Sequence, residues 1–392
     1  MSKQKKKSWK EKQHDRQLKE KNAQKTYQQQ REQAEKSKPR KLPKGKIILG
    51  IVIIFIVIGA YVIIQTPTTN PFETIYIRAD GTIDPSSSSV SKISDTQYTL
   101  LDDIYGSIVI EKDNIVLDGA NYVLNGDNKA LSHGIDLTER NNVIIKNLEI
   151  TNFGFGIYLF LSSNNTISQN NLSLNANGIW LEHSSTNEII ENELSNQYAI
   201  NLNYSPENSI LGNIISDCDG GIALSESSEN FIIDNELGYG FGGIGLSTFS
   251  LNNTISKNQI EYFDDGILLY ESPTNLITEN SISYCGVGFD FTYSFANILN
   301  KNTVRNSQQY GISLISSEDN SIFHNIFSEN NIQVFSSESL NYWDDGYPSG
   351  GNYWSDYEEL YPSSEEIESS GIWNEPYQII ESEHDNYPLI NQ

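Results

Sequence analysis

The sequence contains few cysteine, methionine and histidine residues. Its 392 residues include two Cys, one Met and five His. Two cysteines are too few for a disulfide-dependent fold, even in a compartment that permits disulfides. The same three residue types supply the soft ligands that suit copper. We therefore predict no metal site and no cofactor; a structural calcium ion is an alternative for which we find no supporting motif.

Lysine and arginine are absent from residues 147–256. A polyuronate lyase or uronan epimerase needs such cations to neutralise the carboxylates of its substrate. Beyond residue 46 the chain holds 26 − 17 = 9 Lys/Arg and 51 − 5 = 46 Asp/Glu, a net charge of −37. A surface of this charge repels polyanions, so these activities and nucleic-acid binding are disfavoured for this part of the chain.

Charge has the opposite sign at the N-terminus, where residues 1–46 hold 17 Lys/Arg and 5 Asp/Glu. The next 18 residues, 47–64, carry no charge. As a helix they measure roughly 27 Å, close to the thickness of the bilayer core. A buried soluble helix and a cleaved signal peptide are the alternatives, but the stretch is long for a signal peptide and QTPTT follows it.

The basic flank sets the expected topology, because Lys and Arg accumulate on the cytoplasmic side. We predict a disordered cytoplasmic tail at 1–46, a transmembrane signal anchor at 47–64 and a spacer at 65–74. The remainder is then extracytoplasmic, and the protein is a single-pass protein of the cell membrane. Binding of lipid or nucleic acid by the tail is the alternative to a purely topogenic role.

A repeat of about 22 residues runs through the rest of the chain. The motif G-I-x-L, or a variant of it, begins at ten positions that are 20 to 23 residues apart. These positions are 134, 156, 178, 199, 221, 243, 266, 288, 311 and 331. A second motif, N-x-I-x-x-N-x-I, lies inside most units. Such regular self-similarity is the signature of a repeat architecture.

The alternation of apolar residues in I-x-L predicts short strands with one buried face. No helical pattern separates them, which excludes βαβ units, and the leucine-rich-repeat signature is missing. We therefore predict an all-β fold, a right-handed parallel β-helix of about ten coils over residues 134–340. Residues 75–133 are expected to form the first coils and an N-terminal cap, and residues 341–392 an aromatic and acidic C-terminal cap.

The repeated asparagines are expected to be structural in this fold. We predict that each adopts the left-handed conformation at a turn and that its amide bonds to backbone groups and to the Asn of the next coil. A role as sugar ligands is disfavoured. Cys218 and Cys285 occupy equivalent positions three coils apart, roughly 14 Å at the strand spacing. A disulfide needs Cα atoms within about 7 Å, so we expect none.

These repeats resemble those of the NosD-like parallel β-helix family, also called carbohydrate-binding and sugar-hydrolase domains. The leading stretch DNIVLDGANYVLNGD and the closing elements GGNYWSDY, EPYQI and DNYPLI are similar to those of archaeal surface members. The resemblance covers residues 75–392 and implies the β-helix fold, which hosts lyases, hydrolases, epimerases and plain binders. Founding members are tied to copper-site maturation, a role that the scarcity of soft ligands here argues against.

The outward positions of the third strand are where we expect a ligand site. In G-I-x-L-x-x the third and fifth residues point outwards and the sixth begins the turn. Aromatic rings beside carboxylates suit sugars, since the rings stack on apolar sugar faces. The candidate binding residues are Tyr158, Trp180, Glu182, Tyr204, Tyr270 and Tyr293. The alternative is a mixed polar surface with aromatics placed by chance, in a chain with 22 Tyr.

Catalysis would require a pair of carboxylates about 5–9.5 Å apart, one of them with a raised pKa. The candidates are Glu182, Glu226, Glu271 and Asp290, of which the first two lie two coils apart. The expected function is non-catalytic binding of a neutral glycan or another cell-envelope component at the cell surface. The alternative is a surface glycoside-hydrolase-like enzyme. A copper-related or purely structural surface-layer role fits less well.

The stretch NYWDDGYPSGGNYWSDY, residues 341–357, contains NYW twice. Asn341 falls where the next N-x-I motif is expected, with Trp in the place of Ile. A solenoid end exposes core and unpaired strand edges unless it is closed. We interpret this stretch as a final coil and cap in preference to a ligand site.

Overall fold

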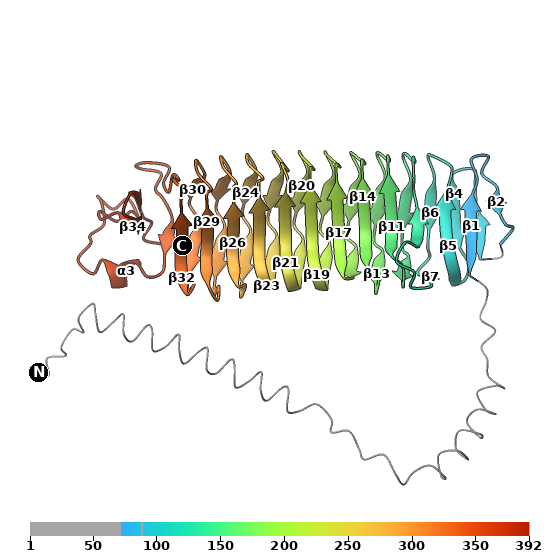
Figure 1. Cartoon of the computed structure of the whole chain (residues 1–392), viewed down its shortest axis with the longest axis horizontal. Helices are drawn as coiled ribbons and strands as arrows, with labels where there is room; N and C mark the ends of the chain where they lie inside the picture. Colours follow the sequence, from blue (N-terminus) through green and yellow to red (C-terminus); the bar gives the residue numbers. More distant parts are fainter. Residues whose placement is uncertain (1–71, 88, 392) are drawn as a thin grey trace, which may run out of the picture. The chain divides into compact units, whose positions relative to one another are not determined.

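The structure, a computed structural model, describes residues 72–87 and 89–391. They form a parallel β-helix of about eleven turns (Figure 1). The sequence predicted about ten, because the first turn precedes the first G-I-x-L motif. No helix among the described residues is long and apolar enough to cross a membrane. The predicted tail (1–46) and anchor (47–64), with most of the spacer, lie outside the described residues.

Each turn contributes three short strands, and the first strands of successive turns form one sheet. These strands are β4 (Gln97–Leu100), β6 (Val116–Asp118), β9 (Ile144–Lys146), β12 (Thr166–Ser168), β15 (Glu188–Ile190), β18 (Ser209–Leu211), β20 (Phe231–Ile233), β22 (Thr254–Ser256), β24 (Leu276–Thr278), β27 (Ile298–Asn300) and β30 (Ser321–Phe323). They pair in parallel without a register shift, for example Ile167 with Ile189. The aliphatic side chains therefore stack along the axis.

The second and third strands of the turns belong to the other large sheet. The second strands are β7 (Val123–Asn125), β10 (Glu149–Thr151), β13 (Asn171–Ser173), β16 (Glu193–Ser195), β25 (Ser281–Ser283), β28 (Thr303–Arg305) and β31 (Ile326–Ser328). The third strands are β8 (His133–Asp136), β11 (Phe155–Phe160), β14 (Asn177–Glu182), β17 (Tyr198–Asn203), β26 (Val287–Thr292), β29 (Tyr310–Ile315) and β32 (Ile332–Ser337). In three central turns the two are continuous, as β19 (Ile214–Ser225), β21 (Glu236–Ser247) and β23 (Gln259–Tyr270).

The N-terminal end is closed by antiparallel pairings. The strands there are β1 (Glu73–Ile77), β2 (Ile83–Asp84), β3 (Val90–Lys92) and β5 (Ile104–Ile110). Strand β1 pairs in parallel with β5 and antiparallel with β2, while β3 folds back on β4. These hairpins cover the first turn, which would otherwise present a free edge for pairing with another chain.

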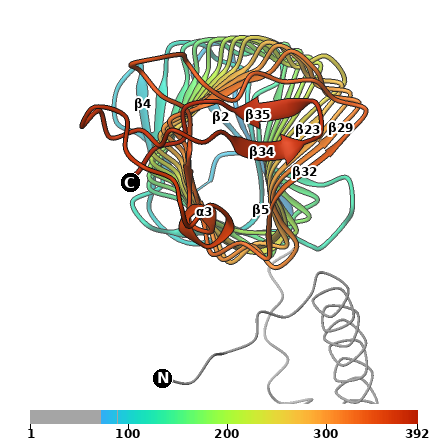
Figure 2. The ribbon, with the colours of Figure 1, turned by 90° about the vertical axis from the view of Figure 1, so that its left-hand side faces the viewer.

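The interior is filled by columns of aliphatic side chains. Figure 2 looks along the solenoid axis, and the space inside the ribbon is occupied by this core. In the first strands the column is Ile145, Ile167, Ile189, Ile210, Ile232, Ile255, Ile277, Leu299 and Ile322, each with no exposed surface. Burying such a side chain contributes about 1.5–3 kcal/mol, so the core grows in proportion to the number of turns.

Two columns of buried asparagine flank the first strands, as the repeat predicted. Asn213 is representative. Its Oδ1 accepts hydrogen bonds from the backbone N–H of Asn192 (2.9 Å) and from Nδ2 of the same residue (3.0 Å). Its own Nδ2 donates to the Oδ1 of Asn235 (3.0 Å) and to the carbonyl of Ile189 (2.9 Å). The side chain has no exposed surface, so a ligand cannot reach it.

One part of the predicted asparagine mechanism is wrong. From Asn165 to Asn325 the ladder asparagines are not the residues with positive φ; the residue immediately before each of them is. Gly212 (φ 61°) precedes Asn213, and Asp234 (φ 56°) precedes Asn235. The ladder Asn must direct its amide inwards along the axis, so the left-handed turn is made one residue earlier, where the side chain faces outwards.

The C-terminal segment packs on the last turn and continues both ladders. Asn341 accepts hydrogen bonds from Asn320, and Asn352 accepts them from Asn325. The elements here are β33 (Tyr353–Trp354), α3 (Tyr357–Leu360), β34 (Tyr377–Ile380) and β35 (Glu383–Asp385). Each NYW therefore ends one ladder, and Trp343 and Trp354 are each only 1% exposed. Neither tryptophan is available to a ligand from solvent.

We predict that Asn213→Ala lowers the free energy of unfolding by about 3–5 kcal/mol. The change leaves the N–H of Asn192 and the carbonyl of Ile189 without a partner, and each buried unsatisfied group costs about 1–3 kcal/mol. The measurement is thermal or urea unfolding. Asn171→Ala, at an exposed strand position two turns earlier, serves as control and should change stability by less than about 0.5 kcal/mol. Equal stabilities of the two variants would contradict the ladder.

Candidate functional site

An open trough of about 300 Å³ lies on the outer face of four adjacent third strands. Its outward side chains are Asn201, Asn203, Ala223, Ser225, Gly245, Ser247, Leu268 and Tyr270. The strand register brings Asn201, Ala223 and Gly245 into one row, and Asn203, Ser225 and Ser247 into the next. Small residues in three successive coils therefore make the floor. A Cβ added to Gly245 would meet no atom within 4 Å.

Bulky side chains stand at the two ends of this row. Trp180 is the register partner of Asn201 and precedes the floor. Leu268, the partner of Gly245, and Tyr270 follow it. Nδ2 of Asn201 is buried and has no hydrogen-bond partner among the described residues. The trough thus offers apolar ends, hydroxyl and amide groups on the floor, and no cation, since residues 147–256 contain no Lys or Arg.

An aromatic cluster precedes the trough and contains three of the predicted residues. Tyr158 stacks on His133 (ring centroids 4.3 Å apart), and Phe155 packs edge-on against Trp180 (5.5 Å). The Tyr158 hydroxyl donates to Glu182 (3.2 Å). Burial, and then the Glu182 charge and hydrogen bond, raise the pKa of Tyr158 to about 12. Glu182 is therefore directed towards Tyr158, away from the trough.

Two other predicted residues, Tyr204 and Tyr293, lie on the turn that borders this face. Tyr204 is 48% exposed and stacks on His183 (4.9 Å). A hydrogen bond to Glu226 is the main cause that raises the pKa of Tyr204. Tyr293 is 51% exposed and packs edge-on against Tyr270 (6.2 Å).

Glu226 and Glu271 are turn residues with φ of 47° and 48°. Glu226 engages Tyr204, and Glu271 raises the pKa of Tyr270. Each of these carboxylates, like that of Glu182, is thus directed to its own tyrosine, and the structure does not bring the three into one carboxylate pair.

Two carboxyl groups lie beside the far end of the trough without lining it, Asp265 on β23 and Asp290 on β26. Asp290 is the register partner of Leu268, and its Oδ1 is buried without a partner among the described residues. Burial raises the pKa of Asp290, and a hydrogen bond from Ser313 opposes this. Burial, followed by the charges of Asp290 and Asp264, raises the pKa of Asp265 to about 6. A proton is therefore available here near neutral pH, as a general acid requires.

Of the residues predicted from the sequence, Tyr270 lines the trough and Trp180 and Asp290 border it, but most of the trough was not predicted. The outward columns were searched for large and charged side chains, whereas the trough is made by small ones. The signal was present as Asn, Ala and Gly at equivalent positions of three consecutive coils, between Trp180 and Leu268. Asp265 was missed because it immediately precedes the glycine of G-I-x-L, and that outward position was not considered.

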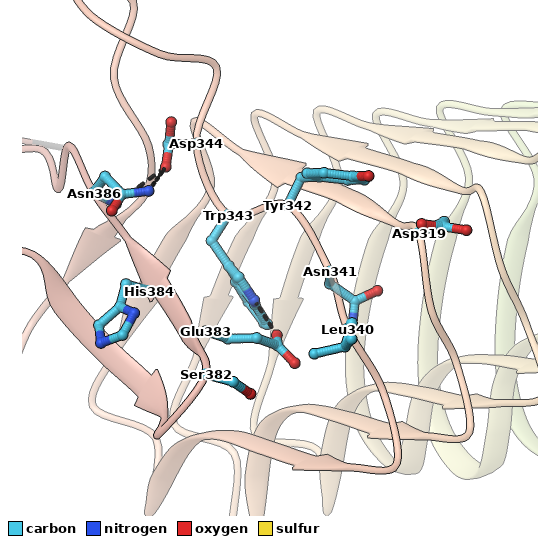
Figure 3. Close-up of a pocket in the computed structure, with 10 residues that line it drawn as sticks. All are labelled: Asp319, Leu340, Asn341, Tyr342, Trp343, Asp344, Ser382, Glu383, His384 and Asn386. Carbon is cyan, nitrogen blue, oxygen red and sulfur yellow. Dashed lines mark hydrogen bonds between the residues drawn. The ribbon is translucent and has the colours of Figure 1, made fainter.

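A cavity of about 560 Å³ lies between the last coil and the C-terminal hairpin (Figure 3). Two of its carboxylates serve the fold. Glu383 accepts from the indole of Trp343 (2.6 Å), and Asp344 accepts from Asn386 (2.9 Å). Asn341 Nδ2 and Glu383 Oε1 have no hydrogen-bond partner among the described residues. One donor and one acceptor are thus left for water or a small polar molecule.

Beneath this cavity Asp385 is fully buried. It accepts from the Trp354 indole (2.9 Å) and from the backbone N–H of Asn352 (2.7 Å) and Tyr387 (3.1 Å). Burial nevertheless raises the pKa of Asp385 to about 7. The group fixes the second NYW copy in place, because it bonds Asn352 and Trp354 directly.

Two family models match the sequence. One is described as "Right handed beta helix region" and matches residues 74–237; the other is described as "Periplasmic copper-binding protein (NosD)" and matches residues 195–359. Together with the solenoid, these matches identify the chain as a right-handed β-helix repeat protein. No curated protein matches the sequence.

Solved structures to which this chain is similar include the periplasmic alginate epimerase AlgG, at 15% identity and a TM-score of 0.47, covering 67% of this chain and 71% of that one. The A-module of the mannuronan C-5 epimerase AlgE6 from Azotobacter vinelandii is 12% identical, with a TM-score of 0.44 and coverages of 74% and 94%. The surface adhesin PfbA of Streptococcus pneumoniae is 13% identical, with a TM-score of 0.42 and coverages of 62% and 71%.

The described residues do not fit a copper site. No group of three or more His, Cys, Asp or Glu side chains in this part of the chain is placed to hold a metal ion. Cys218 and Cys285 are buried free thiols three coils apart. The strand register runs from Cys218 to Gly240 and Phe263, and Cys285 lies in the coil after Phe263. Burial raises their pKa to about 12 and about 11, which disfavours the thiolate that a metal binds.

We predict that Asp265→Asn stabilises the protein at pH 8 by about 1–2 kcal/mol and leaves it unchanged at pH 4. The folded-state pKa of about 6 lies above the unfolded value, so stability is fully present below about pH 4 and is lost as the pH rises through 6. Partial exposure reduces the full linkage energy. The check is the melting temperature against pH. An identical pH dependence in variant and wild type would show that Asp265 ionises normally.

Proposed function

We propose that this protein binds a neutral carbohydrate chain in the outer trough and does so at the cell surface. The single observation that carries the proposal is the trough itself, three coils of small outward residues between Trp180 and Leu268–Tyr270. Clefts of about 300 Å³ with apolar walls and a few polar groups are typical of small-ligand sites. The aromatic ends suit sugar faces, and the Asn and Ser side chains suit sugar hydroxyls.

Charge supports a neutral ligand over an acidic one. The chain beyond residue 46 has a net charge of −37, and no cation occurs in residues 147–256 to pair with a uronate. The location belongs to the same proposal. The apolar stretch 47–64 anchors the chain in the membrane, the basic tail 1–46 stays in the cytoplasm and the β-helix faces the cell envelope.

We predict that Gly245→Trp weakens glycan binding at least about tenfold, a loss of about 1.4 kcal/mol. The added Cβ meets no atom within 4 Å and points into the trough, so the indole occupies the space of the ligand. The measurement is the Kd of the full-length protein in nanodiscs for cellohexaose, maltohexaose, xylohexaose and mannohexaose. Trp180→Ala should also weaken binding, by removal of the aromatic end.

Leu276→Trp is the matched control for Gly245→Trp, because it adds the same ring to the outer face of β24 in the other sheet. It should bind as the wild type does. Oligogalacturonate serves as the acidic probe and should not bind. Preferential binding of oligogalacturonate, or unchanged binding by Gly245→Trp, would rule out the neutral-glycan proposal.

Glycoside hydrolysis is a second candidate function, and Asp265 with Asp290 is the observation that favours it. A carboxyl with a pKa near 6 beside a second carboxyl is the arrangement that separates acid and base roles. In this alternative the protonated Asp265 donates to the leaving oxygen and Asp290 acts on the opposite side of the bond.

We predict that, if this alternative holds, the wild type releases reducing ends from a bound neutral glycan and Asp290→Asn lowers that rate by about 10²–10⁴-fold. Binding of the glycan by Asp290→Asn should persist, which separates chemistry from affinity. If the wild type binds the glycan but releases no reducing ends over long incubation, hydrolysis is excluded and only non-catalytic binding remains.

A further inference from the structure

Strand β21, with the sequence ELGYGFGGIGLS, contains five glycines in 12 residues. Two of them are explained by packing. A Cβ on Gly240 would lie 2.1 Å from the carbonyl oxygen of Cys218, and one on Gly243 would lie 2.5 Å from that of Gly266. The other three, Gly238, Gly242 and Gly245, would each meet no atom within 4 Å.

The backbone conformation does not explain these three glycines either. Gly238, Gly242 and Gly245 all lie outside the left-handed region that favours glycine. Glycine inside a strand is destabilising relative to residues with a side chain. What remains is the other reason for a glycine in a strand, which is the close approach of a ligand to the backbone. The protein keeps an uncovered track along β21.

The track begins in a second groove, of about 260 Å³, on the outer face of the preceding part of the same strands. Gly238 lies on its floor with Ser216, and Tyr239 forms its wall. Tyr239 stacks on Tyr262 (4.8 Å, 4° between planes), which stacks on Tyr284 (5.2 Å, 7°). Because Tyr262 covers only one face of the Tyr239 ring, the other face looks along the solenoid towards the preceding coil.

The three tyrosines are turn residues with exposed rings. Tyr239, Tyr262 and Tyr284 have φ of 66°, 62° and 57°, the left-handed turn that the repeat also places at Asp217 (52°) and Asn306 (57°) in the neighbouring coils. Tyr239 is 57% exposed although it stacks on a neighbour. The carboxylates Glu236 and Glu261 line the same groove and can accept hydrogen bonds from hydroxyl groups.

The track ends in the outer trough, where Gly245 is part of the floor. Seven residues separate Gly238 from Gly245, at most about 23 Å of strand. Gly242 lies between them on the uncovered stretch. Strand β21 thus joins the groove beside Tyr239 to the outer trough. Along it lie three glycines whose lack of a side chain is explained neither by packing nor by backbone conformation.

We propose that a single neutral polysaccharide chain lies along β21, with one segment in the outer trough and a second segment against Tyr239. This inference rests on the proposed function and adds a second binding segment and the direction of the chain. The ligand runs along the strand and therefore across the solenoid axis. Two linked segments bind more tightly than one, because the second binds at high effective concentration.

The test compares short and long probes on the full-length protein in nanodiscs. The pairs are cellotriose with hydroxyethyl cellulose, mannotriose with galactomannan and maltotriose with soluble amylose. A trisaccharide fills the outer trough alone, whereas a polymer reaches both grooves. The polymer of the recognised pair should bind about 100-fold more tightly per chain than the trisaccharide.

We predict that Tyr239→Ala and Gly242→Trp each reduce polymer affinity at least about tenfold and leave the trisaccharide Kd unchanged. Tyr284→Ala, at the far end of the tyrosine stack, is the matched control and should leave both affinities unchanged. If polymer affinity is unaffected by Tyr239→Ala and Gly242→Trp while the trisaccharide still binds, the second segment does not exist. If neither probe binds, the proposed function fails and this inference fails with it.

Stability measurements show whether the glycines of β21 are needed for ligand binding or for the fold. Gly238→Ala and Gly242→Ala should leave the melting temperature unchanged or raise it, because the added methyl meets no atom and reduces the freedom of the unfolded chain. A clear fall in melting temperature for both variants would mean that the strand itself requires glycine. That result would overturn the inference.

Discussion

The rest of the structure depends on one hydrogen-bonding constraint, the vertical alignment of the buried asparagines. Each ladder Asn has to sit directly above its counterpart, so that one Oδ1 accepts both the N–H and the amide of the residue below. A coil that is a residue longer or shorter is tolerated only if the extra residue is placed in a turn, away from the ladder. This explains why the spacing stays within 20 to 23 residues over the repeat. It also fixes the register of every strand.

Because the register is fixed, the position of a residue in the repeat determines where its side chain lies on the outer face. The coil gives its position along the axis, and the place within the coil gives its column. The interior and the asparagine columns carry the stability, which leaves the outward positions free to vary. On the outer face of the third strands, two successive coils carry the bulky aromatic residues Tyr158 and Trp180, and small residues occupy the next three coils. The trough therefore arises because neighbouring coils carry outward side chains of different size, while the path of the backbone stays the same.

The same hydrogen-bonding constraint determines how the solenoid ends at its C-terminus. Asn341 and Asn352 complete the ladders, and the tryptophans that follow replace the aliphatic side chains of a full coil. Their indole N–H groups need partners when buried, and Glu383 and Asp385 supply them. A buried carboxylate is costly in the charged form, as the raised pKa of Asp385 shows. The hairpin that carries Glu383 and Asp385 is thus held in place by hydrogen bonds from the two tryptophans that it covers.

The sequence by itself determined the β-helix, its repeat length, the asparagine ladders and the role of the NYW copies in the last coil, because each follows from the periodic spacing of residue types. The left-handed turn residues were assigned one position late, since spacing does not say which residue of a turn takes the positive φ. The tertiary structure alone decided the trough, the Asp265–Asp290 pair and the glycine track. The trough and the two aspartates consist of residues about 22 or more positions apart, and the glycines of β21 stand out only because no neighbouring atom lies above them. Empty space beside a Gly or Ala becomes a feature only when neighbouring coils are stacked.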